Sequence, residues 1–480
     1  MHTRTVLRVV GFLIFFSGAF MALPLGVSLM YGDGSSRSLL GSMILSCGVG
    51  ALLFLSNRKR GETYLSRREG IAVVTFGWIG LTLVGALPFL LSGTIPDFTN
   101  AYFESMSGFT TTGASILTDV EWLPPGILLW RSLTHWLGGM GIIVLSIAVL
   151  PFLGVGGMQL YKGEVPGPVL DKLKPRISDT ASVLWKVYIA ITALLIALLW
   201  LGNMPLFDAV CHSFATMSTG GFSTKNASLA HYQSAYLDWI VFLFMLVGGI
   251  NFSLHYRFIK GSGSVYHRDP ECRAFLIIVG VLILAITFDI QGQYSFLDSF
   301  RYAAFQVSSI VTTTGLVTAD FDQWPALSKG ILLLCMLLGG MAGSTAGGIK
   351  TMRIILMAKH AYQQIFRIVH PHAVLSVKLG GKPVPQEILT SIWGFFFIYL
   401  GFLVLSTLIM AALGLDLVSA FSSVAACICN VGPGLGVVGP ITNYAAIPLP
   451  GKWILILCML LGRLEIYTVI VLMVPAYWRK

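Results

Sequence analysis

The chain has 480 residues, of which 55% are hydrophobic and only 11% charged, with a formal net charge of +10. A soluble domain carries roughly 25% charged residues, so this composition excludes an ordinary soluble protein and indicates one embedded in lipid. The seven cysteines lie in or near apolar stretches without CxxC spacing, which indicates neither a disulfide framework nor a metal site.

Ten apolar stretches are long enough to cross a membrane, since a spanning helix needs about 20 mostly apolar residues. The first stretch follows Arg4 and Arg8 and also fits a signal peptide. A second apolar stretch follows almost at once, so we interpret the first as a retained helix. The predicted spans are 6–30, 38–56, 70–92, 127–152, 183–202, 237–258, 272–290, 328–358, 389–413 and 452–478.

Positive charge predicts the orientation, because the cytoplasmic segments of membrane proteins carry an excess of Lys and Arg. With a cytoplasmic N-terminus and strict alternation, most of the 31 Lys and Arg residues fall in inner segments, including the run Arg58-Lys59-Arg60. The net charge therefore reflects topology and not nucleic-acid binding. Acidic residues lean outward, among them Asp119, Glu121, Asp320 and Asp322. They predict a mildly negative outer mouth that concentrates cations, and ordinary solvated loops are the alternative.

Four outer connections share one design, in which a short amphipathic stretch ends in a turn of small residues and glycine. An aspartate lies at or near the start of each stretch, where it suits a helix N-terminus: Asp97, Asp208, Asp298 and Asp416. The turns read Phe109–Gly113 (FTTTG), Thr216–Gly220 (TMSTG), Val311–Gly315 (VTTTG) and Ile428–Gly432 (ICNVG). We therefore expect an all-α polytopic protein with four helix–pore helix–filter–helix repeats, at 70–160, 161–268, 269–385 and 386–480, after an N-terminal helix pair at 1–69.

These turns predict a pore, because irregular backbone at membrane depth is tolerated only where it is buried in protein or lines a watery path. Four turns around one axis can offer carbonyl oxygens that replace the water of a dehydrated ion, as in potassium filters. Packing sites of small residues are the alternative, which four matching copies disfavour. The predicted filter residues are Thr111, Thr112, Gly113, Ser218, Thr219, Gly220, Thr313, Thr314, Gly315, Asn430, Val431 and Gly432, with K⁺ held at these positions alone.

Five motifs accompany the turns: Gly108–Ser115 (GFTTTGAS), His135–Gly141 (HWLGGMG), Met217–Ser223 (MSTGGFS), Gly343–Lys350 (GSTAGGIK) and Asn430–Gly436 (NVGPGLG). With them the chain resembles the Trk/Ktr/HKT superfamily of potassium transporters over nearly its whole length. Within that superfamily it is most similar to the bacterial TrkH/TrkG potassium uptake proteins, because it carries an extra N-terminal helix pair. The resemblance implies four helix–pore–helix units around one pore, and glycine at all four filter positions argues for potassium over sodium.

The resemblance also implies a homodimer in the bacterial cytoplasmic (inner) membrane, with both termini cytoplasmic, and a cytosolic regulatory subunit that binds a nucleotide. The basic stretch Lys350–Lys382 could dock that subunit or bind anionic lipid. No covalently bound cofactor and no nucleic-acid partner are expected.

A gate is expected below the filter, where glycines crowd the eighth span and should interrupt its helix. The resemblance places an intramembrane gating loop here and makes Arg463, a costly charge inside the last span, a positive barrier. A glycine-rich packing face, and a structural pairing of Arg463 with Glu465 or with loop carbonyls, are the alternatives. Ala346 departs from the family pattern, in which glycine is frequent, and predicts a slightly stiffer loop. The gate residues are Gly343, Ser344, Thr345, Ala346, Gly347, Gly348, Lys350 and Arg463.

The leading functional hypothesis is a gated, channel-like potassium uptake protein. A sodium- or proton-coupled symporter would share the fold, with Glu465 as the main candidate proton carrier and His135 as a weaker one. A membrane-embedded enzyme would need clustered nucleophiles, bases or metal ligands inside the spans, and the sequence offers none, so we expect no enzyme.

Overall fold

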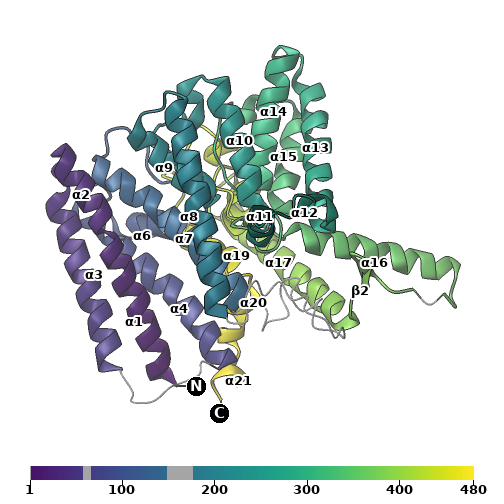
Figure 1. The fold of residues 1–480 in the computed structure, drawn as a ribbon, viewed down its shortest axis with the longest axis horizontal. Helices are drawn as coiled ribbons and strands as arrows, with labels where there is room; N and C mark the ends of the chain where they lie inside the picture. The colour runs from purple at the N-terminus through teal and green to yellow at the C-terminus, as the bar shows by residue number, and fades with distance from the viewer. Residues whose placement is uncertain (1, 58–65, 149–176, 374, 480) are drawn as a thin grey trace.

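The computed structural model describes residues 2–57, 66–148, 177–373 and 375–479, and it is a bundle of helices (Figure 1). The described part contains only one small sheet, the antiparallel pair β1 (Lys378–Leu379) and β2 (Lys382–Pro383). The expected all-α class is therefore confirmed. The basic run 58–60, the inner cations between 162 and 176, and the expected boundary between the first two repeats lie outside the described residues. The N- and C-termini lie at the same end of the bundle in Figure 1.

The first three helices stand at one edge of the bundle in Figure 1. They are α1 (Thr3–Phe20), α2 (Ala22–Tyr31) and α3 (Ser36–Ser56). Glycine lets α1 and α3 approach closely, because a Cβ added at Gly11 or Gly50 would overlap the backbone of the other helix. The hydrophobic residues Val6, Val10 and Ile14 of α1 pack with Ala72 and Val73 of the fourth helix, α4 (Arg67–Gly85).

The remaining helices follow in four groups, each with a short helix inside it. The first group is α4 (Arg67–Gly85), α5 (Leu87–Leu91), α6 (Phe98–Phe109) and α7 (Pro125–Ala148); the second is α8 (Ile177–Leu201), α9 (Leu206–Met217), α10 (Ala235–Gly249) and α11 (Phe252–Ile259). The third is α12 (Val265–Arg268), α13 (Pro270–Ile290), α14 (Phe296–Val311), α15 (Ala326–Leu338) and α16 (Thr351–Val369); the fourth is α17 (Gln386–Ala412), α18 (Leu417–Ile428), α19 (Leu449–Arg463), α20 (Tyr467–Ile470) and α21 (Pro475–Trp478). Short 3₁₀ helices lie at Ser228–Tyr232, Phe321–Gln323, Gly436–Val438 and Val471–Met473.

Three of the ten predicted spans are sharply bent or interrupted by a loop. In the described residues, six helices are long and apolar enough to cross a membrane, or up to eight if two bent pairs each count as one span. The predicted span 237–258 bends by 105° between α10 and α11, and 452–478 bends by 108° after α19. The span 328–358 is interrupted between α15 and α16. At two of these breaks, between α10 and α11 and between α15 and α16, backbone N–H groups of one segment donate to backbone carbonyls of the other.

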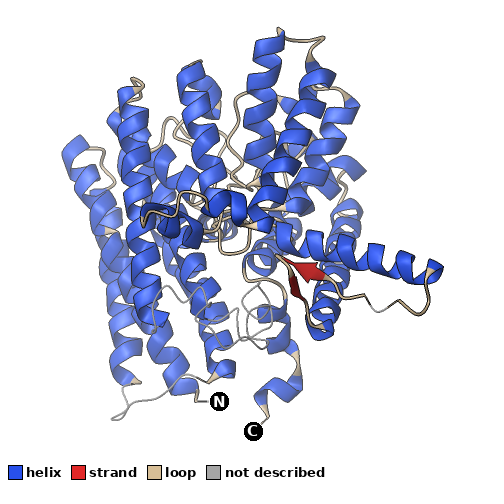
Figure 2. Cartoon of the chain, turned by 45° about the vertical axis from the view of Figure 1, so that its right-hand side comes forward, coloured by secondary structure: helices blue, strands red, loops and turns tan. Residues whose placement is uncertain are grey.

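The outer surface of the bundle is apolar, as lipid contact requires. Along α13, Ile277, Val281, Leu284 and Phe288 are all exposed, while Val279, Ile283 and Ile286 of the same helix are buried. Helix α16 differs, because Figures 1 and 2 show it running sideways, away from the other helices. Four of its apolar side chains, Tyr362, Ile365, Ile368 and Val369, are more than half exposed.

Candidate ion pore and gate

The four short helices α6, α9, α14 and α18 begin as the aspartates predict. Asp97 and Asp416 are N-caps whose carboxylates accept hydrogen bonds from the backbone N–H of Asn100 (2.8 Å) and of Ser419 (3.1 Å). Asp208 and Asp298 are each the third residue of their helix and lie within the first turns of α9 and α14. Acidic groups therefore sit at all four N-termini, and the partial negative charge of each C-terminus lies next to a turn.

Each short helix ends in a turn with the same unusual backbone. The second residue after the helix has a positive φ at Thr111 (50°), Thr219 (54°), Thr313 (56°) and Asn430 (57°). Two residues later, a glycine follows with φ of 82° at Gly113, 83° at Gly221, 74° at Gly315 and 96° at Gly432. Non-glycine residues rarely adopt positive φ, so four copies of this pattern indicate that the packing around the turns imposes it.

The second turn is offset by one residue from the predicted match between the turns, which paired Gly220 with Gly113, Gly315 and Gly432. Gly221 has the positive φ, and Gly220 takes the place of Thr112, Thr314 and Val431. The hydrogen bonds agree, since Gly220 N donates to Ala215 O as Thr112 N does to Ser107 O. The predicted match paired Ser-Thr-Gly with Thr-Thr-Gly. A better signal was Gly-x-Ser, shared by Gly113–Ser115 and Gly221–Ser223.

The four turns close into one ring, with each glycine against the backbone of the next turn. A Cβ added at Gly113 would overlap the carbonyl oxygen of Gly220, and one at Gly221 would overlap that of Thr314. In the same way Gly315 meets the carbonyl of Val431, and Gly432 meets that of Thr112. The chain therefore runs around a single axis in the order of the turns. Only glycine fits at these four contacts.

The fourth turn differs from the others in its side chains. Thr110 and Thr112 pair through their hydroxyls at 2.8 Å, and Thr312 and Thr314 do the same. Asn430 instead donates from its amide to Thr112 Oγ1 (2.9 Å), so it joins the fourth turn to the first. The carbonyl of Gly432 accepts a hydrogen bond of 2.7 Å from the hydroxyl of Tyr444.

Polar side chains on three of the short helices hold the backbone beyond the turns. Glu104, His212 and Gln306 each lie nine residues before the glycine of their turn. The Glu104 carboxylate accepts from Ser115 Oγ and Ile116 N, the His212 ring bonds Ser223 Oγ, and the Gln306 amide bonds Thr318 Oγ1. Sequence reasoning missed these residues, although their equal spacing from the corrected glycines was a usable signal.

A buried ion pair links the first two turns. Arg131 of α7 contacts Glu104 at 2.6 Å, with side chains only 4% and 0% exposed. The same guanidinium donates to Ser223 O (2.9 Å) and lies 3.7 Å from the ring centre of Phe222. Breaking a buried ion pair by removing one partner is strongly destabilising, so this pair fixes the outer side of the ring.

His135 fills the space that the glycine at position 220 leaves empty. A Cβ at Gly220 would overlap the imidazole, which stacks on Phe222 with ring centres 3.9 Å apart. The His135 side chain is fully buried. Its place is therefore inside the wall of the ring.

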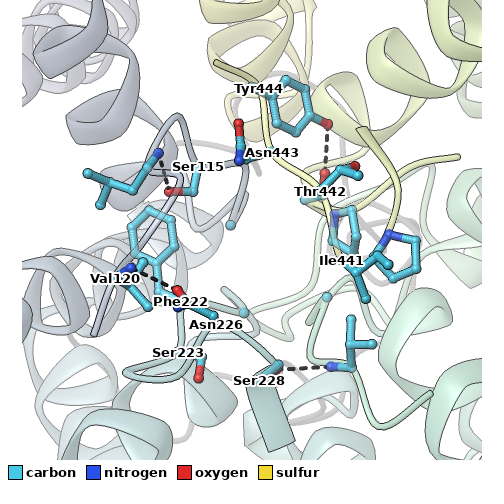
Figure 3. Close-up of a pocket in the computed structure, with 18 of the residues that line it drawn as sticks. Ser115, Val120, Phe222, Ser223, Asn226, Ser228, Ile441, Thr442, Asn443 and Tyr444 are labelled. Atoms are coloured by element: carbon cyan, nitrogen blue, oxygen red, sulfur yellow. Dashed lines mark hydrogen bonds between the residues drawn. The ribbon is translucent and has the colours of Figure 1, made fainter. Parts of the chain in front are cut away.

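A cavity of about 140 Å³ opens above the ring (Figure 3). Glycines of all four turns line it, namely Gly113, Gly221, Gly315 and Gly432. The charged side chains in its lining are the cations Arg131 and Lys225. None of the four acidic residues expected at the outer mouth belongs to this lining.

Those acidic residues hold loops together instead. Asn226 donates to Asp119 from its side chain (2.8 Å) and to Glu121 from its backbone (3.0 Å), and Asp322 accepts from Gly436 N (3.2 Å). Other loop contacts join Val317 N to Ser228 Oγ and Tyr444 N to Ser115 O. Each pair of neighbouring repeats is thus tied at the cavity rim, and the first and fourth close the circle, as some of the dashed bonds in Figure 3 show.

Directly beneath the ring, the segment between α15 and α16 folds as a loop. Met341 N and Thr345 N donate to the carbonyls of Gly249 and Gly248 at the end of α10. The Thr345 hydroxyl contacts Met217 O at the end of the second short helix (3.1 Å). A Cβ at Gly347 would overlap Cys429 O of the fourth turn. Gly347 N also donates to Thr313 Oγ1 of the third turn (2.6 Å), so the loop lies against the second, third and fourth turns.

Charged side chains fasten this loop. Arg463, which is 2% exposed, donates to Thr345 O at 2.7 Å and reaches Gly138 O at 3.4 Å. Lys350 donates to Ala346 O, and Arg353 forms an ion pair with Glu465. Glu271 of α13, which sequence reasoning missed, accepts from Ala342 N (2.9 Å) and Met352 N (3.1 Å) and so bridges both ends of the loop.

The described residues contain no group of three or more His, Cys, Asp or Glu side chains able to hold a metal ion. All seven cysteines are free, and Cys427 and Cys429 are fully buried. The ring is built of backbone, and backbone carbonyl oxygen is the ligand type used in potassium filters.

Comparison with known proteins covers the whole chain. Residues 34–480 match the TrkH family, described as "Cation transport protein". The chain is 44% identical over 488 residues to the "Trk system potassium uptake protein TrkH" of Salmonella typhimurium strain LT2, covering 100% of both chains. It is 37% identical over 484 residues to "TrkG" of Escherichia coli K12, covering 100% of this chain and 99% of that one. Its fold matches the crystal structure of the potassium transporter TrkH from Vibrio parahaemolyticus, with a TM-score of 0.91, 38% identity and 100% coverage of both chains.

Proposed function

The chain belongs to the TrkH family of cation transport proteins, and on this premise we propose that it is a potassium uptake transporter of the Trk system. Transport runs through the single ring of four turns, where carbonyl oxygens take the place of the ion's hydration water. The observation that carries the proposal is the closed ring, in which each glycine rests on the carbonyl of the next turn.

The loop between α15 and α16 acts as the gate. It lies under three of the four turns, and Arg463 holds it through the carbonyl of Thr345. A buried guanidinium on the permeation axis also repels a cation that leaves the filter. Opening requires the loop to leave Arg463. A cytosolic nucleotide-binding Trk subunit, acting on a homodimer in the bacterial inner membrane, supplies the free energy for that step.

Coupling to sodium or protons is the weaker candidate. Glu465, the main candidate proton carrier, is 7% exposed and forms an ion pair with Arg353. A shuttling role would require that contact to break. Flux measured with and without each gradient separates the two modes, and a requirement for a sodium or proton gradient would favour the symporter.

The direct test is rescue of a potassium-uptake-deficient bacterium at low potassium, with and without a cytosolic Trk-type subunit. Rescue that needs the subunit is expected. Gly113→Ala should abolish it, because the methyl group overlaps the backbone of the second turn, while Gly280→Ala has open space around its Cβ and should rescue fully. Failure of the unmodified protein in both strains, despite correct membrane insertion, would contradict the proposal.

A further inference from the structure

One hydrogen bond joins a backbone N–H of the gate loop to a side chain of the ring, in addition to the contact between Thr345 and Met217 O. The backbone N–H of Gly347 donates to the hydroxyl oxygen of Thr313 in the third turn, with a distance of 2.6 Å between the two heavy atoms. Thr313 is fully buried. Gly347 is also packed tightly against the fourth turn, because a Cβ added there would overlap Cys429 O. The bond therefore depends on the loop being in its present place.

The equivalent side chains of the other three turns are engaged differently. The Thr111 hydroxyl has no partner within the described part of the chain, and the Thr219 hydroxyl donates to Ser218 O. Asn430 donates to Thr112 Oγ1 and Met459 O. Among these four residues, then, Thr313 alone receives a hydrogen bond from the loop, although its backbone matches that of the others.

We propose that Thr313 is a positioning residue that couples the gate to the filter, through the hydrogen bond from Gly347. With the loop under the ring, the bond stabilises the closed arrangement. When the loop withdraws, the Gly347 N–H is solvated by water in the cavity, and the third turn loses a neighbour. Ion binding in the filter and closure of the loop are consequently linked, and the linkage acts in both directions. This proposal rests on the gate assigned above.

The central variant is Thr313→Val, which keeps the shape of threonine and removes the acceptor. In the closed state it leaves the Gly347 N–H buried without a partner, a penalty that the open state escapes. Rubidium flux into vesicles without the regulatory subunit should rise by about tenfold, the order expected when a buried donor loses its acceptor. Thr313→Ser retains the hydroxyl, so its flux should rise less than that of Thr313→Val.

The matched control is Thr111→Val, at the equivalent position of the first turn, where the hydroxyl has no partner to lose. It reports what a valine in the ring does to permeation by itself. Whatever a valine in the ring does to permeation, the coupling predicts that flux in Thr313→Val rises well above that in Thr111→Val. Equal effects of the two variants would overturn it.

A second measurement guards against a damaged filter. Ser344 is 1% exposed, so a cysteine there reacts with a cytosolic thiol reagent only when the loop moves. Thr313→Val should speed this reaction in a Ser344→Cys background. Saturating potassium should change the reaction rate less in Thr313→Val than in the Ser344→Cys protein that keeps Thr313. An unchanged reaction rate would also reject the coupling. If Arg463→Ala raises flux and Thr313→Val does not, the coupling fails alone; if neither does, the gate itself fails.

Discussion

At the residue scale, the ring depends on backbone positions more than on side-chain identity. Thr, Thr, Thr and Asn occupy the same positive-φ position, and the glycine two residues later is the one invariant feature. The second turn has two consecutive glycines with different roles. Gly221 is the ring glycine, and Gly220 makes room for His135.

This difference predicts opposite outcomes for two double variants. Gly220→Ala and Gly221→Ala should each impair potassium uptake, since either methyl group overlaps a neighbour. His135→Ala removes the neighbour of Gly220 and should restore uptake to Gly220→Ala. The same change cannot help Gly221→Ala, whose methyl group meets the backbone of Thr314 and a positive φ.

Uptake rates of the four variants, normalised to the amount in the membrane, provide the measurement. His135→Ala alone is the control for the loss of the imidazole. Rescue of both glycine variants, or of Gly221→Ala only, would show that the assigned register is wrong.

At the element scale, one loop residue joins the second and third helices to α7. Asp33, between α2 and α3, accepts hydrogen bonds from Ser28 Oγ, from the backbone and hydroxyl of Ser35, and from Gly126 N at the start of α7 (2.7 Å). Burial raises the pKa of Asp33, but these bonds together outweigh it and hold the pKa below its ordinary value of 3.8.

Asp33→Ala should therefore loosen the docking of α2 and α3 on α7. The expected loss is about 1–2 kcal/mol of unfolding free energy, since several hydrogen bonds to a charged acceptor disappear. A lower thermal midpoint in detergent checks this. Because the folded-state pKa is depressed, the contribution is complete above pH 3.8 and is lost as the pH falls below that value. A difference in midpoint between the variant and the unmodified protein that stays constant from neutral pH down to strongly acidic pH would contradict this assignment.

At the scale of the whole molecule, a nearly fourfold ring is combined with a single, asymmetric loop beneath it. Hydrogen bonds at the cavity rim join each group of helices to the next, yet the loop comes from the third group and Arg463 from the fourth. If the loop is the gate, as proposed, one displacement is enough to open the pore. Asn430, the side chain that makes the fourth turn different, lies next to Gly347 of this loop.

Arg463→Ala should raise potassium flux in vesicles without the subunit, by removing both a hydrogen-bond donor to the loop and a buried positive charge. An increase of about tenfold or more is expected, because hydrogen bonds from charged groups contribute about 1.5–3 kcal/mol. Arg463→Lys keeps the charge and separates the two effects. Unchanged flux in Arg463→Ala would remove the barrier role.

Much of the fold was predictable because its signals are local. Hydropathy located the membrane helices, and glycine turns after short amphipathic stretches located the four pore segments. The continuity of three spans was mispredicted, since an apolar composition is equally compatible with a straight helix and with one bent by 105° or 108°. The filter and gate roles of the named residues stay predictions, which the experiments above address.

The sequence by itself determined the membrane setting, the four turns and the presence of an arginine near the middle of the last predicted span, since each follows from residues close together in the chain. Only the tertiary structure decided the register of the second turn, the Glu104–Arg131 pair and the contact between Gly347 and Thr313. The physical reason is that these features depend on which residues, distant in the sequence, meet around a common axis. A glycine cannot be identified as a ring glycine until the carbonyl that excludes its Cβ is in place.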